Sequence, residues 1–361
     1  MNISIVAGAR PNIIKVAPII RAIKKAKELG RNIGYKLVYV GRENDHTLEP
    51  SLFDDLQIER PNVFLGVDCE NLNELTGQVM SAFEKYLQTN KTDVVIVVDD
   101  LASTMAAAIV TKKQGVMLAH IVAGTRSFDI NMPKEINRLV IDGLSDLLFT
   151  AGMGSNSIAT REGAELSKIY MVGNILVDTL RFNHNRLVRP ALGLEDKSYI
   201  VFTLNRKALI ADKTNLTLML AAMTISAGSI PIIAPLRNSA AAAVMDCMPI
   251  GSNTIKIVEP LSYLEFGYLT ANAKGIITDS GNVAEEATFN GVPCITLNSY
   301  TEHIETVNVG SNVLVGEDAS KLADAVHDMT SGKWKKFNIP DRWDGRSAER
   351  IVQTLLEEKG I

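Results

Sequence analysis

Few residues in this sequence are of the types that build metal sites or disulfide frameworks. The 361 residues include only three cysteines, Cys69, Cys247 and Cys294, which lie far apart. An odd number of distant cysteines fits neither a zinc-site spacing nor a set of disulfides, and it favours a reducing compartment. The five histidines are scattered as well, and no two of them have the spacing of metal ligands. We therefore expect no metal.

Long apolar runs and a strong charge of either sign are also missing. No run approaches the roughly 18 apolar residues that a membrane-spanning helix needs. The formal net charge of −4 at pH 7 gives no reason to expect binding to nucleic acid or to a membrane surface. The first residues, MNISIVAGARP, lack the basic segment of a signal peptide and predict a strand instead. These features predict a cytoplasmic protein that binds neither nucleic acid nor membranes.

What the sequence does contain is the composition and the pattern of an α/β protein. Its 46% hydrophobic and 22% charged residues are typical of a globular protein, and 361 residues exceed one ordinary hydrophobic core. Short apolar runs alternate with helical patterns, which indicates buried strands of parallel sheets. The expected strands form two series, the first at 3–7, 36–40, 94–98, 117–122, 147–150 and 170–173, the second at 199–203, 230–235, 254–258, 275–278, 293–297 and 313–315.

A polar stretch without periodicity separates the two series of strands. It reads LRFNHNRLVRPALGLEDKS, residues 180–198, and predicts a connection between domains. The predicted fold class is therefore α/β, with two Rossmann-like, doubly wound parallel-sheet domains. We place the first domain at residues 1–182 and the second at residues 183–344. A final helix over about 345–358 can pack back on the first domain.

Polar groups follow two strands of the first series, at the sheet edge where such folds bind ligands. After the first strand, Arg10 and Lys15 stand at the start of a helix, where they either present two cations to a phosphate or sugar or are simply solvated. The turn before them is not the G-x-G-x-x-G fingerprint, so NAD is not implied. After the strand at 94–98, Asp100 is either a catalytic carboxylate or a helix cap.

Two further stretches place polar groups beside predicted strands. The loop HIVAGTRSFDINMPKEINR, residues 120–138, gathers many of them, which favours a site over mere solvation. The stretch TDSGNVAEE, residues 278–286, runs from a buried strand into a helix through small residues. The free amides of such a helix start and the helix dipole favour an anion. Alternatively, Ser280 is an ordinary N-cap, and Glu285 or Glu286 only complements the dipole.

Six motifs together resemble those of the non-hydrolysing UDP-N-acetylglucosamine 2-epimerases. They are GARPNIIK, HIVAGTRS, MPKEINR, VGNILVD, TDSGNVAEE and DGRSAERI, in the family's order and at similar spacing from residue 1 to about 351. The resemblance implies two Rossmann-like domains in the arrangement of the GT-B glycosyltransferases. It also implies a homodimer, a UDP-sugar in the cleft with the second domain holding the nucleotide, and no cofactor. An alternative is that the shared residues maintain only the fold.

The resemblance also assigns the groups that would bind the UDP-sugar. Ser280, Gly281 and Asn282 would hold the diphosphate on helix-terminal amides, and Glu286 would hold the ribose hydroxyls. Asn282 stands where the family has a glycine, so its side chain narrows the approach to the phosphate. The remaining nucleotide- or sugar-binding residues that the family implies are Arg10, Lys15, Arg138 and Arg206.

The family's acids and bases are less well matched. Its reaction converts UDP-GlcNAc to UDP-ManNAc by elimination and return of UDP, which requires groups that exchange a proton at C2. The four family positions with that role correspond to Asp100, Val122, Lys134 and Asn205. Only Asp100 keeps its chemistry, because valine cannot titrate, asparagine does not exchange a proton near neutral pH, and Lys134 reverses the charge.

Three functions therefore stay open. The first is a diverged UDP-GlcNAc 2-epimerase, in which Asp100 and Glu135, with or without His303, carry the proton transfers. The second is a hydrolase or glycosyl transferase on the same scaffold, since the nucleotide side is better kept than the sugar side. The third is a catalytically impaired nucleotide-sugar-binding protein or partner subunit, because three of the four acid/base positions are substituted.

Overall fold

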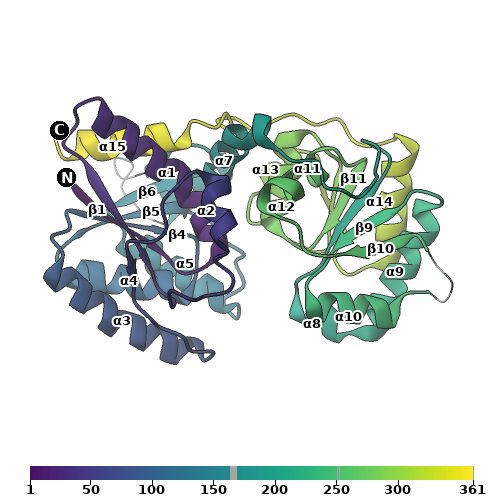
Figure 1. The fold of residues 1–361 in the computed structure, drawn as a ribbon, viewed down its shortest axis with the longest axis horizontal. Helices are drawn as coiled ribbons and strands as arrows, with labels where there is room; N and C mark the ends of the chain where they lie inside the picture. Colours follow the sequence, from purple (N-terminus) through teal and green to yellow (C-terminus); the bar gives the residue numbers. More distant parts are fainter. Residues whose placement is uncertain (163–168, 250, 252, 361) are drawn as a thin grey trace. The chain divides into compact units, whose positions relative to one another are not determined.

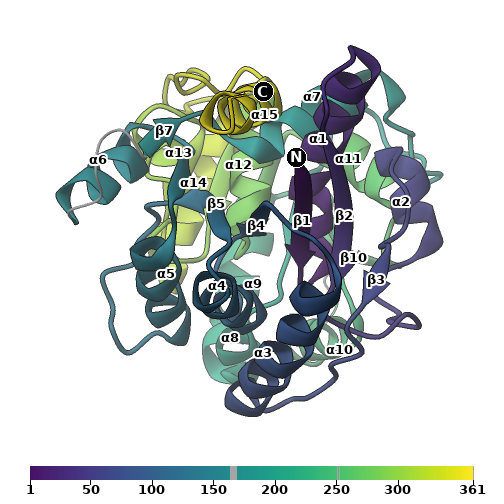
Figure 2. The same cartoon turned by 90° about the vertical axis from the view of Figure 1, so that its left-hand side faces the viewer.

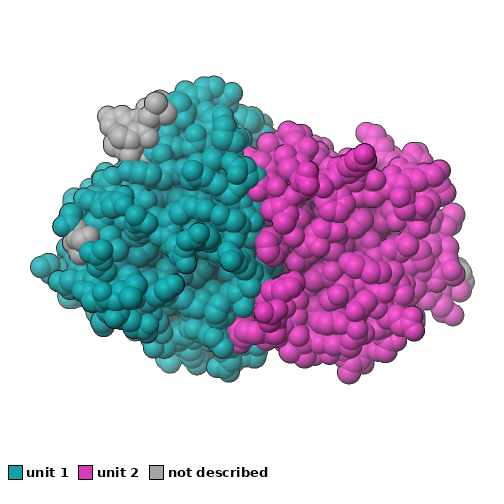
Figure 3. Space-filling model, turned by 90° about the horizontal axis from the view of Figure 1, so that it is seen from above, with its two compact units in different colours: residues 1–182, 341–361 teal, residues 183–340 magenta. Residues whose placement is uncertain are grey.

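The computed structural model of the chain describes residues 1–162, 169–249, 251 and 253–360. The chain forms two compact units, which Figure 3 shows in different colours. Unit 1 consists of Met1–Phe182 together with Asp341–Ile361, and unit 2 of Asn183–Pro340. Among the described residues, no helix is long and apolar enough to cross a membrane.

Unit 1 is built on a seven-stranded sheet whose strands are all parallel (Figures 1 and 2). The strand order is β3-β2-β1-β4-β5-β6-β7. The central strand β4, VVIVV, is buried at every position, as expected of a strand covered on both faces. The strands are β1 (Asn2–Ala7), β2 (Gly34–Tyr39), β3 (Val63–Phe64), β4 (Val94–Val98), β5 (Met117–Ala123), β6 (Leu147–Thr150) and β7 (Ile169–Met171).

Helices cover both faces of this sheet. They are α1 (Arg10–Glu28), α2 (Pro50–Leu56), α3 (Leu72–Thr89), α4 (Ala102–Lys113), α5 (Pro133–Leu144), α6 (Met153–Arg161), α7 (Ile175–Asn183) and α15 (Ser347–Glu358). The C-terminal helix α15 contacts α1, and α3 and α5 flank α4 on the other face (Figure 1). Pro11 in the first turn of α1 suits a helix start, because its missing N–H would have no partner there.

Unit 2 repeats the same architecture with a six-stranded parallel sheet in the order β10-β9-β8-β11-β12-β13. Its strands are β8 (Ile200–Thr203), β9 (Ile232–Pro235), β10 (Ile255–Val258), β11 (Gly275–Thr278), β12 (Cys294–Thr296) and β13 (Asn312–Leu314). Its helices are η2 (His184–Arg186), α8 (Lys207–Ala211), α9 (Lys213–Ala227), α10 (Asn238–Cys247), α11 (Tyr263–Ala271), α12 (Gly281–Asn290), α13 (Glu305–Asn308) and α14 (Ala319–Ser331).

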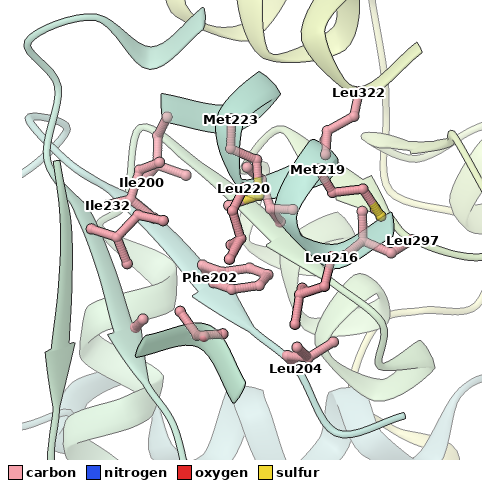
Figure 4. Packing of buried hydrophobic residues seen from close by; sticks show 14 of the residues in the cluster. Ile200, Phe202, Leu204, Leu216, Met219, Leu220, Met223, Ile232, Leu297 and Leu322 are labelled. Atoms are coloured by element: carbon pink, nitrogen blue, oxygen red, sulfur yellow. The ribbon is translucent and has the colours of Figure 1, made fainter. Parts of the chain in front are cut away.

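The core of unit 2 lies between this sheet and helices α9, α10 and α14. Figure 4 shows Phe202 of β8 among Leu216 and Leu220 of α9, all at most 1% exposed. A second cluster on the opposite face joins α11 and α12 to the sheet through residues such as Leu269 and Ala284. Apolar groups on both faces explain why the strands of this unit are continuously apolar.

The predicted fold class is confirmed, with two doubly wound parallel sheets. All of the twelve expected strands have a counterpart in the sheets, with ends that differ by a few residues. The sequence did not predict β3, which is an edge strand of only two residues, Val63–Phe64. Two residues are too few to show any periodicity.

Candidate functional site

The carboxyl ends of β1 and β4 in unit 1 bring Lys15 and Asp99 together. Lys15 Nζ donates to Asp99 Oδ1 at 2.7 Å, and Asn12 Nδ2 donates to Asp99 Oδ2 at 2.9 Å. Lys15 is only 5% exposed, so the cation that the sequence analysis offered to a phosphate has a carboxylate partner. Asp99 has a φ of 58°, a left-handed conformation that aspartate tolerates better than most residues. The sequence analysis did not select Asp99, because only the folded sheet brings it to α1.

Asp100, the next residue, is held by the first turns of α5. Arg138 donates to Asp100 Oδ2 through Nε at 2.9 Å and Nη2 at 2.6 Å, and Lys134 Nζ lies 3.4 Å from Oδ1. Asn137 Nδ2 donates to the Asp100 carbonyl at 2.8 Å. Burial alone would raise the pKa of the Asp100 carboxyl, but the charges of Lys134 and Arg138 hold that pKa below its ordinary value. Asp100 is therefore a fixed, ionised carboxylate.

The carboxylate of Glu135 already accepts several hydrogen bonds from the protein itself. Its carboxylate accepts hydrogen bonds from the amide of Ser127 at 2.9 Å, the hydroxyl of Ser127 at 2.9 Å, the amide of Phe128 at 3.1 Å and Arg138 Nη1 at 3.1 Å. Burial opposes ionisation, but these bonds lower the pKa of Glu135. The carboxylate ties the 124–132 loop to α5, while its proposed role in proton transfer stays a prediction.

Arg10 stands at the start of α1, beside Glu49. Its guanidinium lies 3.9 Å from the Glu49 carboxylate, and 23% of its side chain is exposed. A long, partly exposed pair of this kind contributes little to stability. Arg10 therefore sits at the edge of the same sheet as Lys15, as expected from the turn that follows β1.

A buried ionic network lies under the end of β5. The Asp142 carboxylate contacts His120 Nδ1 at 2.6 Å and Arg126 Nη1 at 2.8 Å, and it accepts from the Gly124 amide at 3.0 Å. Burial alone would raise the pKa of Asp142, but its contacts with His120 and with the Arg126 guanidinium lower it. Arg126 also pairs with Glu162. This network fixes the shape of the chain where β5 ends. The sequence analysis quoted His120 and Arg126 within the 120–138 stretch but did not predict that they share Asp142.

In unit 2, the carboxyl ends of β8 and β11 meet at Asp279. Asp279 Oδ2 accepts from the amides of Asn205 at 2.7 Å and Arg206 at 2.6 Å. The Arg206 guanidinium in turn donates to Asn298 and Glu317. Asp279 thus fixes the loop that carries Asn205 and Arg206. The sequence analysis quoted Asp279 within TDSGN without giving it a role, because its partners lie more than 70 positions away.

The stretch TDSGNVAEE forms the strand end and helix start that its pattern predicts. Ser280 is the N-cap of α12, as the alternative of an ordinary cap expected, but its side chain makes no capping hydrogen bond. Gly281 and Asn282 occupy the first turn, and Glu286 lies one turn further along the helix, 7% exposed. Glu285 is buried beside His303, whose Nε2 lies 3.7 Å from Glu285 Oε1.

The described residues contain no group of three or more histidine, cysteine or acidic side chains that could hold a metal ion. Each unit instead places charged side chains and a helix start at the carboxyl edge of a parallel sheet. The fold and these groups define a class of protein with two Rossmann-like units that carry charged groups and helix starts at the strand ends.

Comparison with known proteins identifies the family within this class. A family model for UDP-N-acetylglucosamine 2-epimerase matches residues 25–356. The UDP-N-acetylglucosamine 2-epimerase of Methanocaldococcus jannaschii is 37% identical over 99% of this chain and 100% of its own. The UDP-2,3-diacetamido-2,3-dideoxy-D-glucuronate 2-epimerase of Pseudomonas aeruginosa is 32% identical over 99% of this chain and 100% of its own. The chain belongs to the UDP-N-acetylglucosamine 2-epimerase family.

Solved structures agree with this assignment. The crystal structure of the M. jannaschii UDP-GlcNAc 2-epimerase in complex with UDP-GlcNAc and UDP matches with a TM-score of 0.83 at 34% identity, covering 99% of this chain and 100% of that one. The lipopolysaccharide outer core galactosyltransferase WaaB matches with a TM-score of 0.59 at 11% identity, covering 99% and 100%. The second similarity concerns the fold alone.

Proposed function

We propose that this protein binds a UDP-sugar and acts on UDP-GlcNAc as a nucleotide-sugar isomerase that produces UDP-ManNAc. The observation that carries the proposal is the Asp100 carboxylate, held by Arg138 at 2.6 Å with Lys134 at 3.4 Å. The charges of these residues keep the pKa of Asp100 low, so the group is ionised at neutral pH. A positioned carboxylate can take the C2 proton once UDP departs, because the positive charge that develops on the sugar acidifies that proton.

The diphosphate is proposed to bind at the start of α12. The amides of Gly281 and Asn282 lie in its first turn, where peptide N–H groups and the helix dipole favour negative charge. Glu286 lies four residues after Asn282, on the same face of the helix, and is proposed to accept from the ribose hydroxyls. The remaining residues that we propose to contact the nucleotide or the sugar are Arg10, Lys15 and Arg138 of unit 1 and Arg206 of unit 2, each taken within its own unit.

A second candidate function is binding without turnover, alone or as a partner subunit. Epimerisation must exchange a proton on both faces of C2, which calls for more than one positioned group. Glu135 is engaged by four hydrogen bonds, and Val122 and Lys134 offer no second carboxylate. This arrangement supports a UDP-sugar-binding protein in which the family reaction is impaired.

We also propose that the protein is cytoplasmic and that it forms a homodimer. All three cysteines are free thiols, which suits a reducing compartment. Four apolar side chains of unit 1 are exposed on α5 and the loop before it, namely Phe128 at 66%, Ile130 at 60%, Ile136 at 42% and Leu139 at 39%. We call these four residues the α5 apolar surface, and their exposure supports a contact with a second copy of the chain.

Proton NMR in D₂O with UDP-GlcNAc distinguishes these functions. An active isomerase replaces the C2 proton by deuterium and forms UDP-ManNAc, and Asp100→Asn lowers that rate by about 10²–10⁴-fold because the base is lost. Asp68→Asn, on the surface beside Arg42, is the control and leaves the rate unchanged.

The other outcomes of the same experiment are equally definite. Saturation-transfer contacts to the uridine with intact substrate would establish binding without turnover. Release of UDP without a C2 epimer would instead indicate a hydrolase, or a glycosyl transferase if it depended on an acceptor. Absence of both contacts and turnover would refute UDP-sugar binding altogether.

A further inference from the structure

Val122 has an unusual backbone conformation at the end of β5. Its φ is 70°, in the left-handed region. The neighbouring residues Ile121 and Ala123 pair with the consecutive residues Phe149 and Thr150 of β6, so Val122 is the extra residue of a β-bulge. A β-branched residue is rare in this conformation, because its Cβ substituents crowd the adjacent peptide groups.

The surroundings of Val122 fix the bulge independently of the valine side chain. The Thr125 hydroxyl donates to the Val122 carbonyl at 3.0 Å, and the Gly124 amide donates to Asp142 at 3.0 Å. Gly124 itself has a φ of 73° and approaches the Ser155 carbonyl so closely that a Cβ atom there would lie 2.2 Å from it. The chain therefore imposes the left-handed conformation on whichever residue occupies position 122.

The bulge lies at the same sheet edge as the Asp99–Asp100 pair. The Asp99 amide donates to the Ile121 carbonyl at 3.3 Å, and His120 Nε2 lies 3.0 Å from the Asp99 carbonyl. Asp99 also has a positive φ, but aspartate tolerates it and its carboxylate binds Lys15 and Asn12. Val122 carries an isopropyl group instead, which can neither donate nor accept a hydrogen bond.

Residues in sparsely populated backbone conformations cluster at active sites and ligand clamps, where the strain is part of the mechanism. Asparagine or glycine would relieve the strain at position 122, so the valine carries a cost in stability there. Val122 is neither buried nor fully exposed, and two acidic residues, Asp99 and Asp100, follow the neighbouring strand β4. An isopropyl group in such a place can contribute only an apolar contact to a ligand.

We propose that Val122 is a specificity-determining residue, whose isopropyl group contacts the acetamido methyl group of a UDP-N-acetylhexosamine. The inference rests on the proposed function, since it takes the ligand to be a UDP-sugar. Among the substituents of such a sugar, the acetyl methyl is the one that is apolar. Val122 therefore favours a 2-acetamido sugar over a 2-hydroxy sugar, and the uridine diphosphate plays no part in that preference.

Calorimetric titration with UDP-GlcNAc, UDP-glucose and UDP tests this proposal on Val122→Asn and Val122→Ile. Val122→Asn relieves the strain and is expected to raise the Tm by about 2–4 °C. It should also reduce the preference for UDP-GlcNAc over UDP-glucose roughly tenfold, with the affinity for UDP unchanged, because one apolar contact is lost. Val122→Ile keeps an apolar β-branched group and should keep the preference.

Gln57→Asn is the matched control, because Gln57 has a φ of 52° at the end of α2 and is exposed. It relieves backbone strain away from the strand ends and should leave all three affinities unchanged. An undiminished UDP-GlcNAc preference in Val122→Asn, or no preference in the natural protein, would overturn the role of Val122 while leaving UDP-sugar binding intact. A natural protein that binds none of the three ligands would overturn the proposed function itself, and the role of Val122 with it.

Discussion

Gly124 illustrates how a single residue maintains the shape of the candidate site. Its φ of 73° is strained for any side chain, and a Cβ atom would lie 2.2 Å from the Ser155 carbonyl. Gly124→Ala is therefore expected to lower the free energy of unfolding by about 2–4 kcal/mol, through backbone strain and a steric clash. Urea unfolding followed by circular dichroism measures the change.

Gly115→Ala separates the two causes of that loss. Gly115 has a φ of 70°, but no atom lies within 4 Å of the position that a Cβ atom would take there. Its substitution should cost only the conformational part, about 1–2 kcal/mol. Equal losses for the two variants would show that the close approach to Ser155 contributes nothing.

The residues of the candidate site were only partly predictable from sequence. Asp100 and Arg138 follow directly from strand ends and motifs, and the structure brings them within 2.6 Å of each other. The partnership of Lys15 with Asp99 was not predictable, since it spans 84 positions and depends on β1 lying beside β4. The bulge at Val122 was not predictable either, because a continuous apolar run does not reveal which residue drops out of the hydrogen-bonded pairing between two strands.

At the scale of elements, Asp178 of α7 attaches the last helix of the chain to unit 1. Its carboxylate accepts from the amides of Ala348 at 2.7 Å and Ser347 at 3.1 Å, in the first turn of α15. Asp178→Ala leaves these two buried amides without a partner and is expected to cost about 1–3 kcal/mol. Scanning calorimetry should show the loss as a lower Tm.

Glu349→Ala is the matched control for Asp178→Ala. Glu349 also lies in the first turn of α15, but it forms an exposed ion pair with Arg346. Such a pair contributes at most about 1 kcal/mol, so the Tm should hardly change. Similar Tm values for Asp178→Ala and the natural protein would contradict the anchoring role of Asp178.

Strands were easier to predict than the details of helix starts. Buried parallel strands appear as continuous apolar runs, as VVIVV in β4 does. Helix starts depend on rotamers that a sequence does not specify, and Ser280 occupies the N-cap of α12 without capping it through its side chain. The order of the strands in each sheet could not be predicted from the apolar pattern either. It depends on which strands lie side by side in the folded protein, and local periodicity does not contain that information.

At the scale of the whole molecule, the proposed homodimer can be tested on the α5 apolar surface. Replacing both Ile136 and Leu139 by glutamate places two charges in the proposed contact, so the mass from light scattering should fall from that of two chains to that of one. The control replaces Leu218 and Ile225 of α9, which are 57% and 80% exposed, by glutamate, and should leave the mass unchanged. A single-chain mass for the natural protein would contradict the proposal.

The path of the chain also has a consequence for its synthesis on the ribosome. Unit 2 is one continuous segment, whereas unit 1 needs residues from both ends of the chain. Helix α15 packs on α1, which is made more than 300 residues earlier. Domains generally fold in the order in which they emerge, but here the first unit to be started is the last to be completed. The surface of α1 that α15 covers therefore stays exposed until α15 has been made, and a nascent-chain chaperone can reach that surface during this time.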